Sequence, residues 1–382
     1  MAEAHAESET QRDIAPARPL LPARVSIVVP SFNEVENVGP LHDALCRALT
    51  GIAWEMIYVD DNSPDRTADH VRALANRDAR VRVVHRVGRR GLSSACVEGV
   101  LASAAPYIVV MDADLQHDEV VIPDMIRALE EGRGELIAAS RYVDGGGIGT
   151  WSKQRAWASR FATLLAKRLT GTELTDPMSG FFAIERAAFM RSLPRLSSIG
   201  FKILLDIAAS APAPLRVVEV PYQFRNRQHG ESKLDSLVLW EYFQLLLDKM
   251  FGRYVPVRFI TFGMVGSFGV LVHFTILTAL FKGFGATFAI AQGAATFVAI
   301  TNNFVLNNLL TYRDRRLQGW GLVRGWVTFN LVCATGAAAN IGVADWLFER
   351  PTSWVLSAIA GIAISVVWNY AMSGIVTWRK AK

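Results

Sequence analysis

The chain has 382 residues, of which 51% are hydrophobic and 20% are charged, and its mean hydropathy is +0.23. This composition excludes a disordered chain and is more apolar than that of most soluble enzymes. The net charge of +5 comes from residues 256–382, where ten Lys and Arg face three Asp and Glu; residues 1–255 carry a net charge of −2. We therefore expect no nucleic-acid partner. Three cysteines without a Cys-x-x-Cys pair argue against a disulfide framework or a zinc site.

The N-terminal segment, residues 1–23, is polar and acidic, and it lacks the apolar stretch of a signal peptide. We expect a disordered tail that stays in the cytoplasm. From residue 25 onward, short apolar runs alternate with amphipathic stretches, which predicts strands joined by helices in a mostly parallel sheet. The predicted strands are 25–30, 54–60, 81–85, 107–112 and 135–140, and the predicted helices lie near 35–49, 66–76, 92–104 and 120–131. No Gly-x-Gly-x-x-Gly follows the first strand, which disfavours a dinucleotide-binding oxidoreductase.

Carboxylates follow two of the predicted strands. Asp60 and Asp61 follow the apolar run of the second strand, and Asp112 and Asp114 follow that of the fourth. Ligands of parallel sheets bind at the carboxyl ends of the strands. Two carboxylates at positions i and i+2, with the amide oxygen of Gln116 nearby, can converge on one hard cation such as Mg²⁺. Alone, such an Asp-x-Asp pair often only caps the turn that follows it, so the neighbouring segments have to support the metal-site interpretation.

The last third of the sequence contains four long apolar stretches, each long enough to cross about 30 Å of hydrocarbon. They are Phe259–Phe281, Ala286–Leu306, Val327–Leu347 and Trp354–Trp378. Ten Lys and Arg lie on the side of the globular part, and only Lys282 and Arg350 lie on the other. The positive-inside rule then predicts an integral protein of the cell membrane with both termini and the globular domain in the cytoplasm.

Two further stretches, Arg155–Leu169 and Leu237–Tyr254, combine aromatic and Leu residues with basic ones but are too short to span a bilayer. This pattern is typical of helices that lie in the membrane surface, although ordinary core-packing helices remain an alternative. Arg155 and Arg160 are candidates for contact with a phosphate of a lipid substrate. Contact with lipid headgroups or solvent is the alternative for both.

Seven segments, in this order and spacing, resemble the family 2 glycosyltransferases, specifically the dolichol-phosphate (polyprenol-phosphate) mannose synthases. They are 29–34 (VPSFNE), 59–65 (VDDNSPD), 91–99 (GLSSACVEG), 111–117 (MDADLQH), 176–182 (DPMSGFF), 200–206 (GFKILLD) and 220–234 (VPYQFRNRQHGESKL). The resemblance covers roughly residues 24–250. From about residue 253, the chain is similar to the GtrA-like four-helix membrane domain, through RFITFGMVG at 258–266 and NNFVLNNLLT at 302–311.

The resemblance implies an α/β GT-A catalytic domain followed by an all-α transmembrane domain. It implies inverting transfer of mannose from GDP-mannose to a polyprenyl (dolichyl-type) monophosphate, with Mg²⁺ or Mn²⁺. By motif matching, Asp112, Asp114 and Gln116 fall on the metal positions, with Ala113 between them against the substrate. The other matched positions are the nucleotide-pocket residues Pro30, Phe32 and Glu34, the base and ribose contacts Val59 and Asp61, and the sugar and phosphate contacts Arg141, Arg227 and Lys233.

Four positions need separate comment. Phe32 stands where the family often has Tyr, so stacking is kept and a hydroxyl is lost. Arg66 stands where Gly is usual in an Asp-Gly-Thr turn, and we expect that turn to differ locally. His117 is interpreted as a hydrogen-bonded polar residue rather than a catalytic one. Asp176 is either a cap next to Pro177 or a residue on the acceptor side.

The expected chemistry also follows from charge. A lipid phosphate is largely ionised near neutral pH, because its second pKa is about 6, so it needs no general base to attack an anomeric carbon. The obstacle is repulsion between an anionic acceptor and an anionic diphosphate, which Arg and Lys side chains and a divalent cation offset.

We expect four regions: a tail (1–23), the catalytic domain (24–235), an interfacial helix (236–254) and the membrane domain (255–382). Partners would be the nucleotide sugar, the lipid phosphate and the bilayer, and a homo-oligomer stays open. The alternative functions are a UDP-glucose-dependent polyprenyl-phosphate glucosyltransferase and a non-catalytic flippase for lipid-linked sugars. Intact Asp112 and Asp114 argue against the flippase.

Overall fold

The computed structural model describes residues 22–147, 174–197, 200, 202–225, 236–252, 254–350 and 353–379. Its contacts divide the chain into two compact units, Met1–Tyr242 and Phe243–Lys382. The boundary falls inside helix α8 (Ser236–Phe251), which overlaps the predicted amphipathic helix 237–254. The other predicted amphipathic helix, 155–169, and the predicted disordered tail, except for its last two residues, lie outside the described residues.

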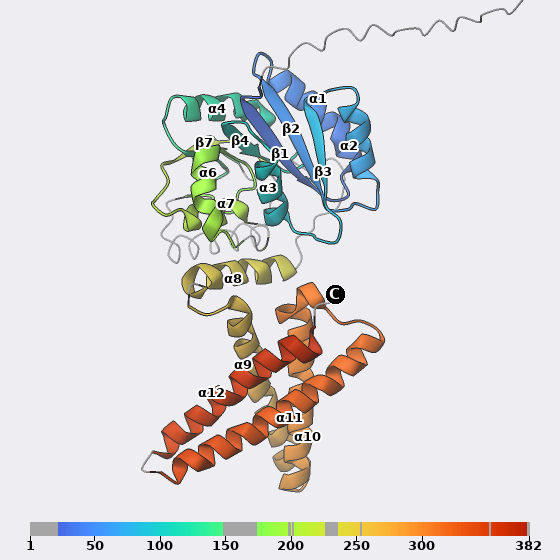
Figure 1. The fold of residues 1–382 in the computed structure, drawn as a ribbon, viewed down its shortest axis with the longest axis vertical. Coiled ribbons are helices and arrows are strands. Elements are labelled where there is room, and N and C mark those ends of the chain that lie inside the picture. The colour runs from blue at the N-terminus through green and yellow to red at the C-terminus, as the bar shows by residue number, and fades with distance from the viewer. Residues whose placement is uncertain are drawn as a thin grey trace, which may run out of the picture. The chain divides into compact units, whose positions relative to one another are not determined.

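The first unit is a three-layer α/β/α structure around a seven-stranded sheet (Figure 1). Its strands are β1 (Val25–Ser31), β2 (Trp54–Asp60), β3 (Val81–His85), β4 (Tyr107–Val110), β5 (Leu136–Ser140), β6 (Phe182–Glu185) and β7 (Val217–Pro221). Its helices are α1 (Val38–Ala48), α2 (Thr67–Ala75), α3 (Leu92–Leu101), α4 (Ile122–Glu130), α6 (Arg186–Ser192) and α7 (Ile203–Ser210), with short 3₁₀ turns at Val35–Asn37, Glu119–Val121 and Leu193–Arg195.

The strand order is β3-β2-β1-β4-β6-β5-β7. Strand β1 pairs in parallel with both β2 and β4, and only β6 runs antiparallel to its neighbours. The mostly parallel sheet is therefore confirmed. Because the order reverses between β1 and β4, the carboxyl ends of these two strands border a crevice, the usual ligand position in open α/β sheets.

The strands β1 and β2 are buried on both faces, as the apolar runs predict. Val25, Ile27 and Val29 face a core that α1, α2 and α4 cover, whereas Val28 and Ile57 face the core under α3, α6 and α7. The cores on the two faces of the sheet thus hold the ends of β1 and β2 in place, and the loops of the site start from these ends.

Two expectations need correction. The strand predicted over 107–112 ends at Val110, so Asp112 lies in the following loop rather than in the strand. The turn before α2 was expected to differ from an Asp-Gly-Thr turn, but it keeps the left-handed conformation that favours glycine. Arg66 adopts this conformation, with φ +69°, and is the N-cap residue of α2. Its side chain is 84% exposed, so it accommodates the unfavourable backbone without clashing with the core.

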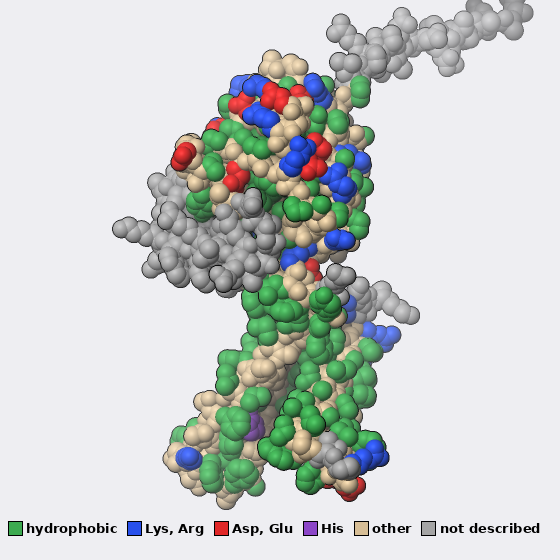
Figure 2. Space-filling view, turned by 90° about the vertical axis from the view of Figure 1, so that its left-hand side faces the viewer, with side chains coloured by type: hydrophobic (Ala, Val, Ile, Leu, Met, Phe, Trp, Pro, Cys, Tyr) green, Lys and Arg blue, Asp and Glu red, His purple; other side chains and the backbone are tan. Residues whose placement is uncertain are grey.

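The second unit contains the four predicted spans, which are confirmed as long apolar helices. They run over Val257–Gly283, Phe288–Thr311, Trp320–Phe348 and Trp354–Thr377 and consist mainly of α9 (Val257–Thr278), α10 (Phe288–Leu306), α11 (Trp320–Phe348) and α12 (Trp354–Met372). Hydrophobic side chains dominate the surface of this unit in Figure 2, whereas acidic and basic ones gather on the first unit.

The membrane unit contains two similar helical hairpins, α9–α10 and α11–α12, which were not predicted from the sequence. Helix α10 continues into a π-helix at Asn307–Thr311 and α12 into one at Ser373–Thr377. The rings of Tyr312 and Trp378, which follow these π-helices, stack at 4.2 Å. Equivalent positions of the two hairpins carry similar residues: Thr261 and Thr328, Phe262 and Phe329, Val265 and Val332, Gly269 and Gly336, and Asn303 and Asn369.

Candidate active site

The candidate site lies at the carboxyl ends of β1, β2 and β4, where four of the matched segments meet. Asp61 follows β2, and its backbone N–H donates to the carbonyl of Ser31 at the end of β1 (3.1 Å). Its carboxylate accepts from Arg86 Nη1 (2.8 Å) and from the backbone N–H of Gly91 (2.7 Å). Burial raises the pKa of Asp61, while the Gly91 N–H and Arg86 oppose that rise. The fully buried guanidinium of Arg86 therefore keeps this carboxylate oriented.

The loop after β1 carries the residues matched to the nucleotide pocket. The guanidinium carbon of Arg90 lies 4.4 Å from the ring centre of Phe32. Glu34 is fixed on both sides: its N–H donates to Thr67 Oγ1 (3.0 Å), and its carboxylate accepts from Asn37 Nδ2 (2.7 Å). The ring of Phe32 thus forms a cation–π contact with Arg90 at the mouth of this loop.

The DAD loop (residues 111–117) carries the predicted metal ligands directly after β4. The Asp112 side chain is 37% exposed, whereas Asp114 is buried and accepts the N–H of Gln116 (3.2 Å). Gln116 Nε2 donates to the carbonyl of Arg225 (3.1 Å), and the Arg225 N–H donates back to the Gln116 carbonyl (2.9 Å). These bonds join the DAD loop to the chain just before residues 226–235.

The donors of the DAD loop fit a hard divalent cation, because they are two carboxylates and one amide oxygen on a short, hydrogen-bonded loop. A second group of possible ligands among the described residues is His42, Cys46 and Asp78. There the guanidinium of Arg80 already lies 2.6 Å from Asp78 Oδ2 and 3.4 Å from Cys46 Sγ. That group is a satisfied ion-pair cluster, so the DAD loop is the better metal position.

Arg141 and Asp176, which are 35 positions apart, form a buried ion pair. Arg141 Nε and Nη2 donate to the two carboxylate oxygens at 2.7 and 2.8 Å. Asp176 is fully buried, and its N–H donates to Glu219 Oε1 (3.1 Å). Asp176 is therefore more than a turn cap: it orients Arg141, the residue matched to the sugar and phosphates.

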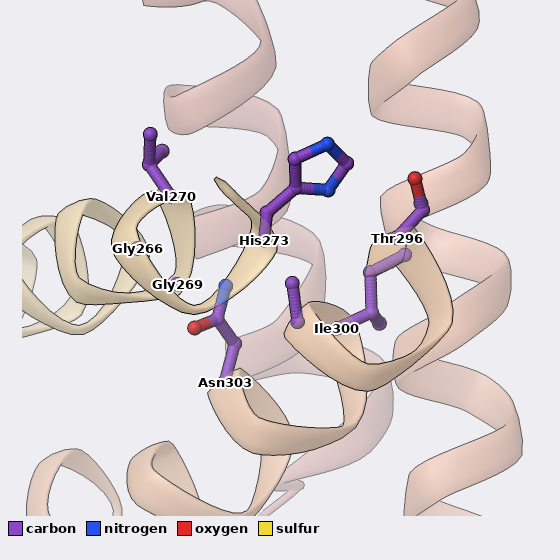
Figure 3. A pocket seen from close by; sticks show the side chains of 8 residues that line it. Gly266, Gly269, Val270, His273, Thr296, Ile300 and Asn303 are labelled. Atoms are coloured by element: carbon purple, nitrogen blue, oxygen red, sulfur yellow. The ribbon is translucent and has the colours of Figure 1, made fainter. Parts of the chain in front are cut away.

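Four predicted site residues, Arg155, Arg160, Arg227 and Lys233, lie outside the described residues. Pro30 and Val59 are paired with each other one residue before the ends of β1 and β2, and Ala113 lies in the DAD loop, all at the same sheet edge. A groove elsewhere lies between α9 and α10 in the membrane unit (Figure 3); Gly269 and His273 line it on one helix, and Thr296 and Asn303 on the other. It contains none of the predicted site residues.

Comparison with known proteins identifies the family. The model of glycosyl transferase family 2 matches residues 26–193, and that of the GtrA/DPMS transmembrane domain matches residues 261–378. A dolichol-phosphate mannosyltransferase of Pyrococcus furiosus is 33% identical over 357 residues, which cover 93% of this chain and 99% of that protein. The enzyme of the same name from Saccharomyces cerevisiae is 37% identical over 257 residues, covering 64% of this chain and 95% of that protein.

Among solved structures, a glucosyl-3-phosphoglycerate synthase of Mycobacterium tuberculosis matches 60% of this chain and 80% of its own, at 22% identity and a TM-score of 0.44. The chain belongs to glycosyltransferase family 2. It is a glycosyltransferase with a GT-A catalytic domain, and an integral membrane protein whose transmembrane part is of the GtrA/DPMS type.

Sequence reasoning missed two residues that hold the site together. Arg86 reaches Asp61 across 25 positions, and Glu219 reaches Asp176 across 43. Arg86 directly follows a predicted apolar strand, a place where a charge needs a partner, whereas Glu219 lies in β7, which was not predicted.

Proposed function

We propose that the protein transfers mannose from GDP-mannose to a polyprenyl (dolichyl-type) monophosphate at the cytoplasmic membrane face, with inversion at the anomeric carbon. The observation that carries the proposal is the DAD loop at the β1/β4 crevice in a chain that aligns over 93% of its length with a dolichol-phosphate mannosyltransferase. Mannose and the dolichyl-type acceptor follow from the name of that relative, GDP follows from the motif resemblance, and the cytoplasmic face follows from the distribution of Lys and Arg.

In this proposal, the loops after β1 and β2 bind the nucleotide. Phe32 stacks on the base, and Asp61, held by Arg86, accepts from the ribose or base. Asp112, Asp114 and Gln116 would hold Mg²⁺ or Mn²⁺. When bound there, the cation supplies charge stabilisation to the departing diphosphate.

The acceptor phosphate is ionised, so the protein's task is to bring two anions together in line. Arg141 is suited to this, because Asp176 fixes its orientation while the guanidinium keeps its positive charge. Arg227 and Lys233 would complete the clamp on the diphosphate, and Arg155 and Arg160 would hold the lipid phosphate.

A transfer assay tests the proposal. Purified full-length protein in detergent is incubated with a polyprenyl phosphate and labelled GDP-mannose, UDP-glucose or other nucleotide sugars, and label in the lipid fraction is counted. Metal-dependent labelling from GDP-mannose alone is the expected result. Labelling from UDP-glucose instead would establish the glucosyltransferase. No labelling from any nucleotide sugar by a folded protein would contradict catalysis.

A further inference from the structure

His117 lies at the end of the DAD loop, and the proposed function leaves it unused. It is 2% exposed, so its polar contacts lie inside the protein. Those contacts indicate its role.

The ring nitrogens of His117 both face Asp112. Nδ1 accepts the backbone N–H of Asp112 at 3.1 Å, so Nδ1 carries no proton and the ring proton resides on Nε2. Nε2 in turn lies 3.7 Å from Asp112 Oδ2. One side chain therefore closes the loop at the backbone of Asp112 and presents an N–H toward its carboxylate.

Aromatic packing holds the imidazole in this position. Phe181 stacks on it at 5.0 Å with planes inclined by 10°, and Tyr222 and Phe224 meet it edge-on at 5.9 and 6.2 Å. Gly180 precedes Phe181, and a Cβ there would lie 3.1 Å from Asp112 Oδ2. The DPMSGFF segment thus supports both the ring and the carboxylate that the ring faces.

The loop needs such a closure because its backbone is strained. Leu115 has φ +61°, a left-handed conformation that a bulky non-glycine residue rarely adopts. Conformations of this kind persist only where surrounding contacts over-determine them. The bond from Asp112 N–H to His117 spans Leu115, so it is one of the contacts that keep the loop in this shape.

We propose that His117 is a positioning residue for the divalent cation: it holds Asp112 in the orientation that binds metal and thereby sets metal affinity. The inference rests on the proposed metal-dependent function, because it assigns the metal to the DAD loop. Partners that orient metal ligands affect metal affinity by about 10–100-fold when they are removed.

Mn²⁺ binding tests the inference. Full-length protein in detergent with GDP is titrated with Mn²⁺, and free and bound ion are measured by electron paramagnetic resonance. His117→Leu, which removes both ring nitrogens, should weaken Mn²⁺ binding about 10–100-fold. His117→Asn places an amide oxygen where Nδ1 lies and should stay within about threefold of wild type, because the loop remains closed. His70→Asn, at an exposed histidine on α2, is the control and should bind Mn²⁺ as wild type does.

The possible outcomes are distinguishable. Wild-type affinity in a folded His117→Leu protein overturns the positioning role and leaves the proposed function intact. If His117→Leu does not fold, His117→Gln takes its place: its longer amide leaves the Asp112 N–H unpaired, and unchanged Mn²⁺ affinity would again overturn the role. Wild-type protein that transfers sugar but binds no Mn²⁺ would refute both the metal assignment and the role of His117.

Discussion

Asp176→Asn removes the charge that neutralises Arg141 while keeping the shape of the side chain. Arg141 is 8% exposed and Asp176 is fully buried, so the variant leaves a guanidinium in the interior without its counter-ion. The variant also places an amide NH₂ opposite the N–H groups of Arg141, which in wild type donate to the carboxylate oxygens of Asp176 at 2.7 and 2.8 Å. Breaking a buried ion pair in this way costs about 3–5 kcal/mol.

Thermal unfolding of the full-length protein in detergent measures this cost. In a domain of roughly 150–250 residues, each kcal/mol shifts the Tm by about 2–4 °C, so we expect Asp176→Asn to lower the Tm by roughly 6–20 °C. The matched control is Asp124→Asn, which breaks an exposed pair with Arg127 in which both side chains are more than 60% exposed. Exposed pairs of this kind contribute about 0–1 kcal/mol, so the control should lower the Tm by no more than roughly 4 °C.

A double variant separates stability from chemistry. Replacing both partners of a buried pair by apolar residues of similar volume is often nearly neutral. Arg141→Met with Asp176→Leu should therefore recover most of the lost Tm, but it should not recover sugar transfer, because the guanidinium is gone. A Tm of Asp176→Asn within 1 °C of wild type, at the precision of the scan, would refute the ion-pair reasoning. Normal transfer by the double variant would refute the role of Arg141.

Four further outcomes are expected. Asp112→Ala or Asp114→Ala should abolish transfer in a protein that still folds, and EDTA should abolish transfer by wild type; activity in EDTA would argue against a metal. Lys233→Ala should reduce the initial rate at least tenfold if it stabilises the diphosphate in the transition state by about 1.4 kcal/mol or more, and full activity would contradict the clamp. Arg66→Gly should be more stable than Arg66→Ala by about 1 kcal/mol in urea unfolding, since only glycine adopts this φ freely. Protease-cleavable tags before residue 1 and after residue 382 should both be protected in sealed, right-side-out vesicles, and cleavage of either tag would contradict the predicted orientation.

β1, β2, β4 and β5 could be predicted because most of their residues are buried on both faces, so these strands appear as apolar runs in the sequence. β6 and β7 could not be predicted in this way. β6 is four residues long and antiparallel, and β7 lies at the sheet edge with every residue at least partly exposed. Neither one displays the length or the periodicity that distinguishes a strand from a loop.

The site was predictable to the extent that its residues are neighbours in sequence. The Asp112–Gln116 spacing already suggests a cation site. The contacts that orient the site are different, because Arg86 meets Asp61, and Gln116 meets Arg225, across 25 and 109 positions. The pairing of β2 with β3 brings the first two together, and contacts between loops bring the other two together. No local pattern contains that information.

The repeated hairpin of the membrane unit indicates how the protein divides its tasks. At equivalent places, Asn303 lies so close to Gly269, and Asn369 to Gly336, that a Cβ on either glycine would come within 2.3 Å of the amide oxygen. Close approach of small residues, with amides across the interface, is how helices associate where apolar surface alone gives no driving force. Asn303 and Asn369 thus serve helix association. Charged side chains, which would mark chemistry inside a membrane, are confined to the helix ends; Asp345 and Arg324 each lie within about a turn of an end of α11. The chemistry is therefore assigned to the first unit, where the carboxylates and arginines are.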